Sequence, residues 1–167
     1  DPEKPFRPNY LLDDHIAILT LFPGMREEVM NAYLDIPNLR GLVLKTYGAG
    51  NAPKLPWLYE RLKTLSERGV VIVNTTQCAT GAVDMGRYDT SLQLIQAGVL
   101  NGHDMTLEAV VTKLMFLLGH NYDNQRICQL MNTSLVGEVT LPFAPQTDDE
   151  ACLQRGQTAK ARRVCAD

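Results

Sequence analysis

Two polar loops follow two apolar runs, and their residue types are those that hold small polar molecules. The first loop covers residues 45–53 (KTYGAGNAP), and the second covers residues 74–81 (NTTQCATG). Hydroxyl, amide and thiol groups are concentrated in residues 75–78, where they could donate and accept hydrogen bonds. A threonine nucleophile would need an adjacent base, and the sequence places none nearby. The second loop therefore indicates a binding site, with a turn capped by its own hydroxyls as the alternative.

The first loop offers backbone amides and one side-chain amide. Its Gly-x-Gly is a weak dinucleotide signal, because Pro53 replaces the third glycine of G-x-G-x-x-G and no acidic residue ends the following strand. Glycines allow positive φ angles and a close backbone approach, while Asn51 supplies both a donor and an acceptor. This loop suits a ligand that carries a carboxylate or an amide, and an ordinary Gly-Asn turn is the alternative.

Other catalytic patterns are missing from the sequence. His15, His103 and His120 are scattered, and none is placed as a base for either loop. There is no G-x-S-x-G elbow, and the four cysteines show neither a CxxC pair nor the spacing of a zinc site. Asp13 and Asp14 are expected to form a surface charge pair rather than a catalytic dyad. We expect no metal site.

Short apolar runs without alternation predict strands that are buried on both faces, as in a parallel sheet. The runs cover residues 15–22, 41–46 and 70–74, and residues 98–100 predict a short fourth strand. Ligands of such sheets collect at the carboxyl ends of the strands. Both polar loops directly follow a predicted strand, so they should lie at that edge.

Apolar residues spaced by three and four predict helices between and after these strands. The predicted ranges are 25–34, 57–68, 90–97, 107–118 and 124–131. We expect Asp104 or Thr106 to cap the fourth helix, and Asp123 to cap the fifth. The apolar stripe of the first helix should be Met25, Val29, Ala32 and Tyr33, and that of the second Leu58, Leu62 and Leu65, with Gly69 as its stop.

The alternation of strands and helices predicts an α/β fold: a three-layer domain with a small, about four-stranded parallel sheet flanked by helices. The 167 residues suit one domain, and 45% hydrophobic residues are ordinary for a soluble globular protein. A net charge of −3 and a pI near 5.6 argue against nucleic-acid binding. No apolar run approaches the length of a membrane span, and the cysteine usage favours the cytoplasm.

The chain divides into three parts by composition. Residues 1–14 start with Asp-Pro-Glu-Lys-Pro, without an initiator Met or an apolar signal core, and read as a linker from a missing N-terminal domain or as a processed end. Residues 15–140 form the α/β domain. Residues 141–167 are a polar tail or extension, whose arginines and lysine are expected to be solvated, with a basic docking surface as the alternative.

A series of motifs, taken in order, resembles the C-terminal domain of cytoplasmic-type (type I) L-asparaginases. The resemblance covers about residues 16 to 140 and rests on these stretches: LFPG (21–24), KTYGAGNAP (45–53), VIVNTTQC (71–78), AGV (97–99), DMTLEA (104–109), KL (113–114) and VGEVT (136–140). One such motif would be weak evidence, whereas the ordered series with the expected gaps is specific.

The resemblance implies an enzyme that hydrolyses L-asparagine to L-aspartate and ammonia without a metal or organic cofactor. The family's nucleophilic threonine and its relay lie in Thr-Gly-Gly-Thr and Gly-Thr-Asp-Thr motifs of an N-terminal domain, and neither motif occurs in this chain. This polypeptide should therefore be inactive alone. It should act with an N-terminal asparaginase domain in a cytoplasmic homo-oligomer, a dimer or tetramer, with no nucleic-acid or membrane partner.

The resemblance also assigns roles to particular residues. Asn51 matches the residue that reaches a neighbouring subunit's active site, so it is the expected substrate-binding residue. An allosteric pocket for a second asparagine would be lined by Lys45, Thr76, Gln77 and Cys78. Lys45 departs from the arginine of bacterial relatives, and lysine holds a carboxylate as a point charge rather than in a bidentate fork. Allosteric binding through Lys45 is therefore an open question.

Two other functions remain open at this stage. A non-catalytic regulatory domain that senses an amino acid would need the same two loops. An asparaginase-like amidohydrolase could instead act on another amide, as the amidotransferases that deamidate charged tRNA do.

Overall fold

The computed structural model describes residues 5, 8–79, 81–86 and 89–140, and the expected tail at 141–167 lies outside the described residues. The described part contains four strands and five helices. Their order is β1 (Ile16–Thr20), α1 (Glu27–Leu34), β2 (Gly41–Thr46), α2 (Pro56–Glu67), β3 (Val71–Thr76), α3 (Asp89–Gln96), β4 (Leu100–Asn101), α4 (Leu107–Gly119) and α5 (Asn124–Met131). No helix in this part is long and apolar enough to cross a membrane.

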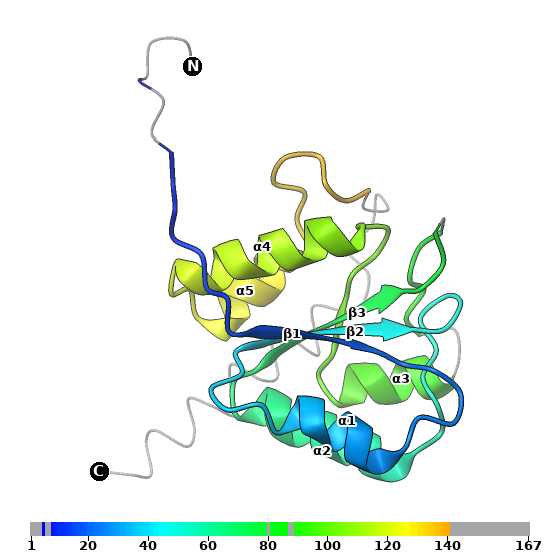
Figure 1. Cartoon of the computed structure of the whole chain (residues 1–167). Helices are drawn as coiled ribbons and strands as arrows, with labels where there is room; N and C mark the ends of the chain where they lie inside the picture. Colours follow the sequence, from blue (N-terminus) through cyan, green and yellow to red (C-terminus); the bar gives the residue numbers. More distant parts are fainter. Residues whose placement is uncertain (1–4, 6–7, 80, 87–88, 141–167) are drawn as a thin grey trace.

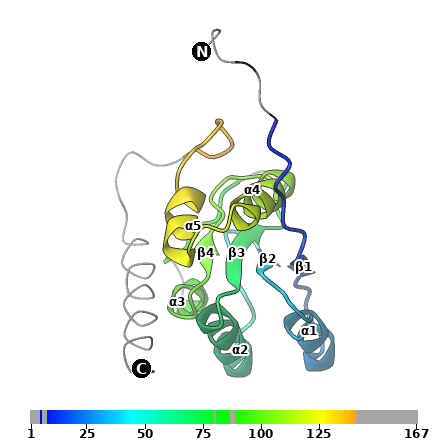
Figure 2. The same ribbon diagram turned by 90° about the vertical axis from the view of Figure 1, so that its left-hand side faces the viewer.

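The predicted α/β architecture is confirmed. All neighbouring strands pair in parallel, and the strand order of the sheet is β1-β2-β3-β4. Right-handed crossovers are the rule between parallel strands, and they place the connecting helices on one face when each strand is added on the same side. In agreement with this rule, α1, α2 and α3 all cover one face. Helices α4 and α5 cover the other face, which completes three layers (Figure 1). Figure 2 shows the same layers from a second direction.

The sheet has a hydrophobic core on each face. Successive side chains of a strand point to opposite faces, so a central strand must be apolar at every position. Leu42 and Leu44 of β2 belong to the core under α1–α3, while Val43 of the same strand belongs to the core under α4 and α5. This arrangement explains the unbroken apolar runs of the sequence.

The predicted stripe of the first helix is wrong. Helix α1 begins at Glu27 and buries Met30 and Leu34, whereas Tyr33 stays 37% exposed. Residue Met25 precedes the helix, so it does not set the helical phase. The pair at positions i and i+4 that faces the sheet is therefore Met30 and Leu34.

Most other local predictions agree with the structure. The stripe of Leu58, Leu62 and Leu65 is buried, and the chain turns at Gly69 with a φ angle of +97°. Strand β3 runs two residues further than predicted, and the fourth strand lies at Leu100–Asn101 rather than at 98–100. Strand β1 covers Ile16–Thr20 and is therefore shorter than the predicted run at 15–22.

Of the two candidate caps of α4, only one is correct. The hydroxyl of Thr106 accepts a hydrogen bond from the backbone N–H of Ala109 at 3.2 Å. The carboxylate of Asp104 instead accepts from the backbone N–H of Thr140 at 2.8 Å. Asp104, three residues before the first residue of the helix, therefore holds Thr140 at the end of the described chain. Asp123 caps α5 as predicted.

The segment before β1 packs against the C-terminal end of α4 (Figure 2). The backbone N–H of Asp13 donates to the carbonyl of Met115 at 3.0 Å. A Cβ atom at Gly119 would lie 2.5 Å from the carbonyl oxygen of Leu11, so only glycine lets the two backbones come this close. The side chains of Asn9 and His120 are also hydrogen-bonded. This contact fixes the direction in which the chain enters the domain.

A buried ion pair fixes the segment after α5. The ammonium of Lys113 lies 2.6 Å from the carboxylate of Glu138, and their side chains are 4% and 11% exposed. The same ammonium donates to the carbonyls of Thr133 and Met131. Glu138 also accepts the backbone N–H groups of Leu135 and Val136. Each buried charge thus has several hydrogen-bond partners, which a buried pair requires.

Burial by itself would raise the pKa of Glu138. The hydrogen bonds from Lys113 and the backbone outweigh that effect and lower the pKa from 4.5 to about 2. A carboxylate with a lowered pKa stabilises the fold above its unfolded-state pKa, and loses this contribution as the pH falls through its folded-state pKa. The relevant window is therefore from pH 4.5 down to about 2.

We predict that Glu138→Gln lowers the free energy of unfolding at pH 7 by about 3 kcal/mol, because it leaves Lys113 charged and buried without its counter-ion. Chemical denaturation of both proteins measures this difference. The difference in the free energy of unfolding between wild type and variant should become smaller as the pH falls from 4.5 toward 2. The exposed Glu67→Gln serves as a control with little effect. A gap that stays constant over this range would contradict the assigned role.

Candidate functional site

The two polar loops lie side by side at the carboxyl ends of β2 and β3, as predicted (Figure 1). The backbone N–H of Gln77 donates to the carbonyl of Thr46 at 3.0 Å. The hydroxyl of Thr76 donates to the carbonyl of Gly48. The loop after β3 is therefore hydrogen-bonded to both the end of β2 and the loop that follows it.

The loop after β2 is closed on itself. Tyr47 and Asn51 exchange two backbone hydrogen bonds of 2.8 Å, and the N–H of Gly50 also donates to the carbonyl of Tyr47. Gly50 has a φ angle of +105°, and a Cβ atom there would lie 2.6 Å from Cγ1 of Val83. Glycine is thus required for both the conformation and the space. The result is a tight loop that presents Asn51 at a defined place.

The buried side-chain amide of Asn74 supports this loop through hydrogen bonds. Asn74 of β3 is fully buried; its Oδ1 accepts from the hydroxyl of Thr46 at 2.7 Å, and its Nδ2 donates to the carbonyl of Gly50 at 3.0 Å. Both ends of the amide are satisfied, as burial demands. The side chain therefore joins two strands to the loop that carries Asn51. Asn74 was predicted as the first residue of the second loop, and no local pattern indicates this supporting role.

The Asn51 side chain is oriented by a contact from α3. The hydroxyl of Thr90 donates to Oδ1 of Asn51 at 3.1 Å, and Asn51 is half-buried. Among the described residues, Nδ2 of Asn51 has no hydrogen-bond partner, so it is the open donor of the loop. Sequence reasoning missed Thr90, because nothing in the local pattern indicates that α3 reaches the loop after β2.

Thr76, Gln77 and Cys78 are brought together, but most of their polar groups are used within the loops. The side-chain amide of Gln77 donates to the carbonyls of Leu21 at 2.6 Å and of Lys45 at 3.0 Å. The hydroxyl of Thr76 accepts from the N–H of Cys78 at 2.9 Å. The free thiol of Cys78 is exposed. The main structural role of these three residues is therefore to join the strand ends by hydrogen bonds.

The side chain of Lys45 leaves the sheet on the opposite face from that of Thr76. In the sheet register, Lys45 is paired with Thr20 and Thr75, whereas Thr76 is paired with Thr46. Side chains alternate between the faces along a strand, so those of Lys45 and Thr75 leave toward α4, opposite to that of Thr76. Lys45 forms no ion pair within the described part of the chain, and the buried hydroxyl of Thr75 has no hydrogen-bond partner.

No histidine ring among the described residues is hydrogen-bonded to a residue of either loop. His15 is bonded to Asp13, His103 to Asn132, and His120 to the carbonyl of Phe116 and to Asn9. A threonine hydroxyl needs a base to become a nucleophile. Within the described residues, the loops can therefore bind and orient a ligand, and no histidine is placed to activate one of their threonines.

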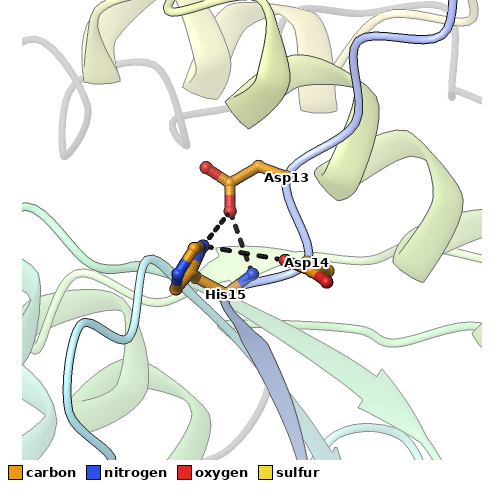
Figure 3. A group of neighbouring side chains, drawn as sticks. All are labelled: Asp13, Asp14 and His15. Carbon is orange, nitrogen blue, oxygen red and sulfur yellow. Dashed lines mark hydrogen bonds and ion pairs between the residues drawn. The ribbon is translucent and has the colours of Figure 1, made fainter.

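Asp13, Asp14 and His15 form one cluster with metal-ligand atoms within 4.8 Å of one another (Figure 3). The cluster lies at the start of β1, at the opposite edge of the sheet from the two loops. Asp13 is only 11% exposed; its carboxylate accepts from the backbone and ring of His15 and pairs with Arg40. Asp13 is therefore not part of a surface charge pair, which corrects the sequence-based prediction.

The pKa of Asp13 is consistent with this structural role. Burial by itself would raise it, but the hydrogen bonds from His15 and the guanidinium of Arg40 lower it below its ordinary value. With a cation already bound to the carboxylate by the chain itself, the cluster is an anchor for the start of the sheet. We assign no metal to it.

Comparison with known proteins agrees with the predicted fold and family. The profile of the glutaminase/asparaginase C-terminal domain matches residues 15–131. L-asparaginase 1 of Escherichia coli K12 is 42% identical over 125 residues, which are 75% of this chain and 37% of that protein. The human 60 kDa lysophospholipase is 38% identical over 134 residues, 78% of this chain and 23% of that protein.

A solved structure gives the same result in three dimensions. L-asparaginase I from Vibrio cholerae superimposes with a TM-score of 0.72 at 43% identity, covering 77% of this chain and 39% of that one. The chain thus spans less than two fifths of the length of these relatives. On its motifs, its four-stranded parallel sheet and these matches, the chain belongs to the glutaminase/asparaginase C-terminal domain family.

Proposed function

We propose that this chain is the C-terminal part of an L-asparaginase, in which it helps to complete the active site for the hydrolysis of L-asparagine to L-aspartate and ammonia. The observation that carries the proposal is Asn51. Its open Nδ2 donor projects from a rigid loop at the strand ends, the edge where α/β folds bind ligands. The similarity to L-asparaginases in sequence and fold supports the choice of substrate.

The active site in this proposal is shared. No histidine ring in the described part of this chain is hydrogen-bonded to a threonine of the loops, so the proposal takes the threonine chemistry from an N-terminal asparaginase domain. Asn51 then contributes from the C-terminal domain of a neighbouring subunit, which requires a homo-oligomer of at least two copies. The reaction uses no cofactor, and we place the protein in the cytoplasm with the type I enzymes.

A second asparagine is proposed to bind near Lys45, Thr76, Gln77 and Cys78. The ammonium of Lys45, which has no ion pair with a described residue, supports an interaction with a carboxylate. The register, however, directs Lys45 away from Thr76, and the polar groups of the other residues are largely occupied. Lys45 therefore carries the effector proposal, with the remaining three residues shaping the strand ends.

Two other functions are distinguished by direct binding measurements. A self-sufficient amino-acid sensor would bind L-asparagine as an isolated domain. A shared catalytic site would bind only in the complete protein. An enzyme for another substrate would bind L-asparagine in neither form, and the similarity to a lysophospholipase makes this alternative worth testing.

We expect calorimetry to detect no binding of L-asparagine at the active-site loop of the 167-residue chain, and to detect it once an N-terminal asparaginase domain is present. The complete protein should release ammonia from L-asparagine. Binding by the isolated chain that Asn51→Ala removes would favour the sensor function instead. No ammonia release from the complete protein would contradict the proposed activity.

We predict that Asn51→Ala raises KM for L-asparagine in the complete enzyme by roughly ten-fold, because one hydrogen-bond donor to the site is lost. Steady-state kinetics measures the change, and the thermal midpoint should be nearly unaltered since Asn51 is only half-buried. A matched control is Asn121→Ala in the exposed turn after α4. Unchanged kinetics would remove the bridging role of Asn51.

For Lys45→Ala, we expect the cooperative response of the complete enzyme to L-asparagine to weaken, because the point charge that holds the effector's carboxylate is removed. Initial rates over a wide range of substrate concentration measure the Hill coefficient. The exposed Lys63→Ala on α2 provides a control of equal charge change. A sigmoidal curve that survives in Lys45→Ala would rule out this effector site.

A further inference from the structure

Thr90 stands out because it connects a helix to the proposed substrate-binding residue. It lies in the first turn of α3, a segment that is far from Asn51 in sequence. Its hydroxyl donates to Oδ1 of Asn51 at 3.1 Å, and among the described residues this is the one hydrogen bond of the Asn51 side chain. Thr90 is only 8% exposed, so water cannot easily replace its hydrogen bond to Asn51.

The backbones that carry Thr90 and Asn51 are both held in place. In α3, Ser91 and Leu94 are fully buried, and the hydroxyl of Ser91 accepts the backbone N–H of Gly86 at 3.1 Å. On the other side, Asn51 is held through its backbone by Tyr47. Because neither backbone can move freely, the hydrogen bond acts on the rotation of the amide group.

An asparagine side chain can present either an acceptor or a donor, depending on how its amide is turned. With Oδ1 engaged by Thr90, the group that remains open is Nδ2, which only donates. The matching group in the site must be an acceptor oxygen, such as a carboxylate or an amide carbonyl. An ammonium group would be refused, since it is itself a donor.

We infer that Thr90 is a positioning residue for the reaction, because its hydroxyl turns the Asn51 amide so that Nδ2 donates to an acceptor oxygen in the shared active site. The inference rests on the proposed function. It adds a residue from α3 to the loops at the strand ends, and it defines the chemical class of the group that Asn51 contacts.

The first test compares Thr90→Val and Thr90→Ser in the complete enzyme. Valine keeps the shape but removes the hydroxyl, so the amide of Asn51 is no longer held in one orientation. We expect KM for L-asparagine to rise roughly five-fold with kcat nearly unchanged. Serine restores the hydroxyl and should return KM to within about two-fold of the wild type. Thr64→Val, whose hydroxyl bonds only to a carbonyl of its own helix, is the control without effect.

The second test changes the chemistry of residue 51 itself. Asn51→Asp has no donor, and its carboxylate would face the acceptor oxygen. We expect Asn51→Asp to raise KM more than Asn51→Ala does, because its carboxylate oxygens repel an acceptor oxygen, whereas the truncation only removes a hydrogen bond. A lower KM in Asn51→Asp would mean that the contacted group is a donor, and it would overturn the inference. This test stands even where Thr90→Val folds poorly.

The outcomes separate the inference from the proposed function. An unchanged KM in Thr90→Val, together with a raised KM in Asn51→Ala, would overturn the role of Thr90 and leave the shared active site intact. A KM that changes in neither variant would instead remove Asn51 from the active site. Equal KM changes in Thr90→Val and Thr90→Ser would also overturn the role, because the effect would then come from packing.

Discussion

The whole strand-end region depends on the requirement that the buried amide of Asn74 be fully hydrogen-bonded. Its oxygen takes the hydroxyl of Thr46, and its nitrogen gives a bond to the carbonyl of Gly50. Its backbone carbonyl accepts the N–H of Gly102, where a Cβ atom would lie 2.5 Å from that oxygen. One residue thus ties together β2, β3, the loop that carries Asn51 and the chain that leaves β4. An unsatisfied amide at this depth would be costly, so these elements are held in a single arrangement.

This arrangement separates residues that hold the loops from residues that remain available. Thr76 and Gln77 use their polar groups to join the strand ends, whereas Asn51 and Lys45 keep a donor group open on two different faces of the sheet. The described loops thus present two groups at defined positions. The shared site proposed above needs this property, because its reacting threonine would be supplied by another domain.

Two charged contacts away from the loops keep this frame in place. At the start of the sheet, Arg40 and His15 hold the carboxylate of Asp13. Behind α4, Lys113 and Glu138 fix the segment that follows α5. Both contacts join parts of the chain that lie far apart in sequence. They define where the chain enters and leaves the described domain.

The sequence alone determined the elements and the position of the loops, because these follow from local patterns. Unbroken apolar runs predicted β2 within its observed limits, the stripe of Leu58 and Leu62 predicted α2, and Asp123 predicted the start of α5. The ordered motifs also indicated the family. Local patterns gave a wrong result in two places. The helical phase of α1 was wrong, because the helix buries Met30 rather than the predicted stripe. Asp104 does not cap α4, because its carboxylate accepts a hydrogen bond from Thr140, which is distant in sequence.

Only the tertiary structure decided which polar groups remain open. The sheet register sends Lys45 and Thr76 to opposite faces, although they were predicted to share one pocket. The hydrogen bond from Thr90 to Asn51 joins α3 to a loop 39 positions earlier in the chain. No sequence pattern records such a contact, because it depends on how α3 packs on the sheet. The sequence therefore identifies the residues of the site, and the packing of helices and strands determines which of their atoms can meet a ligand.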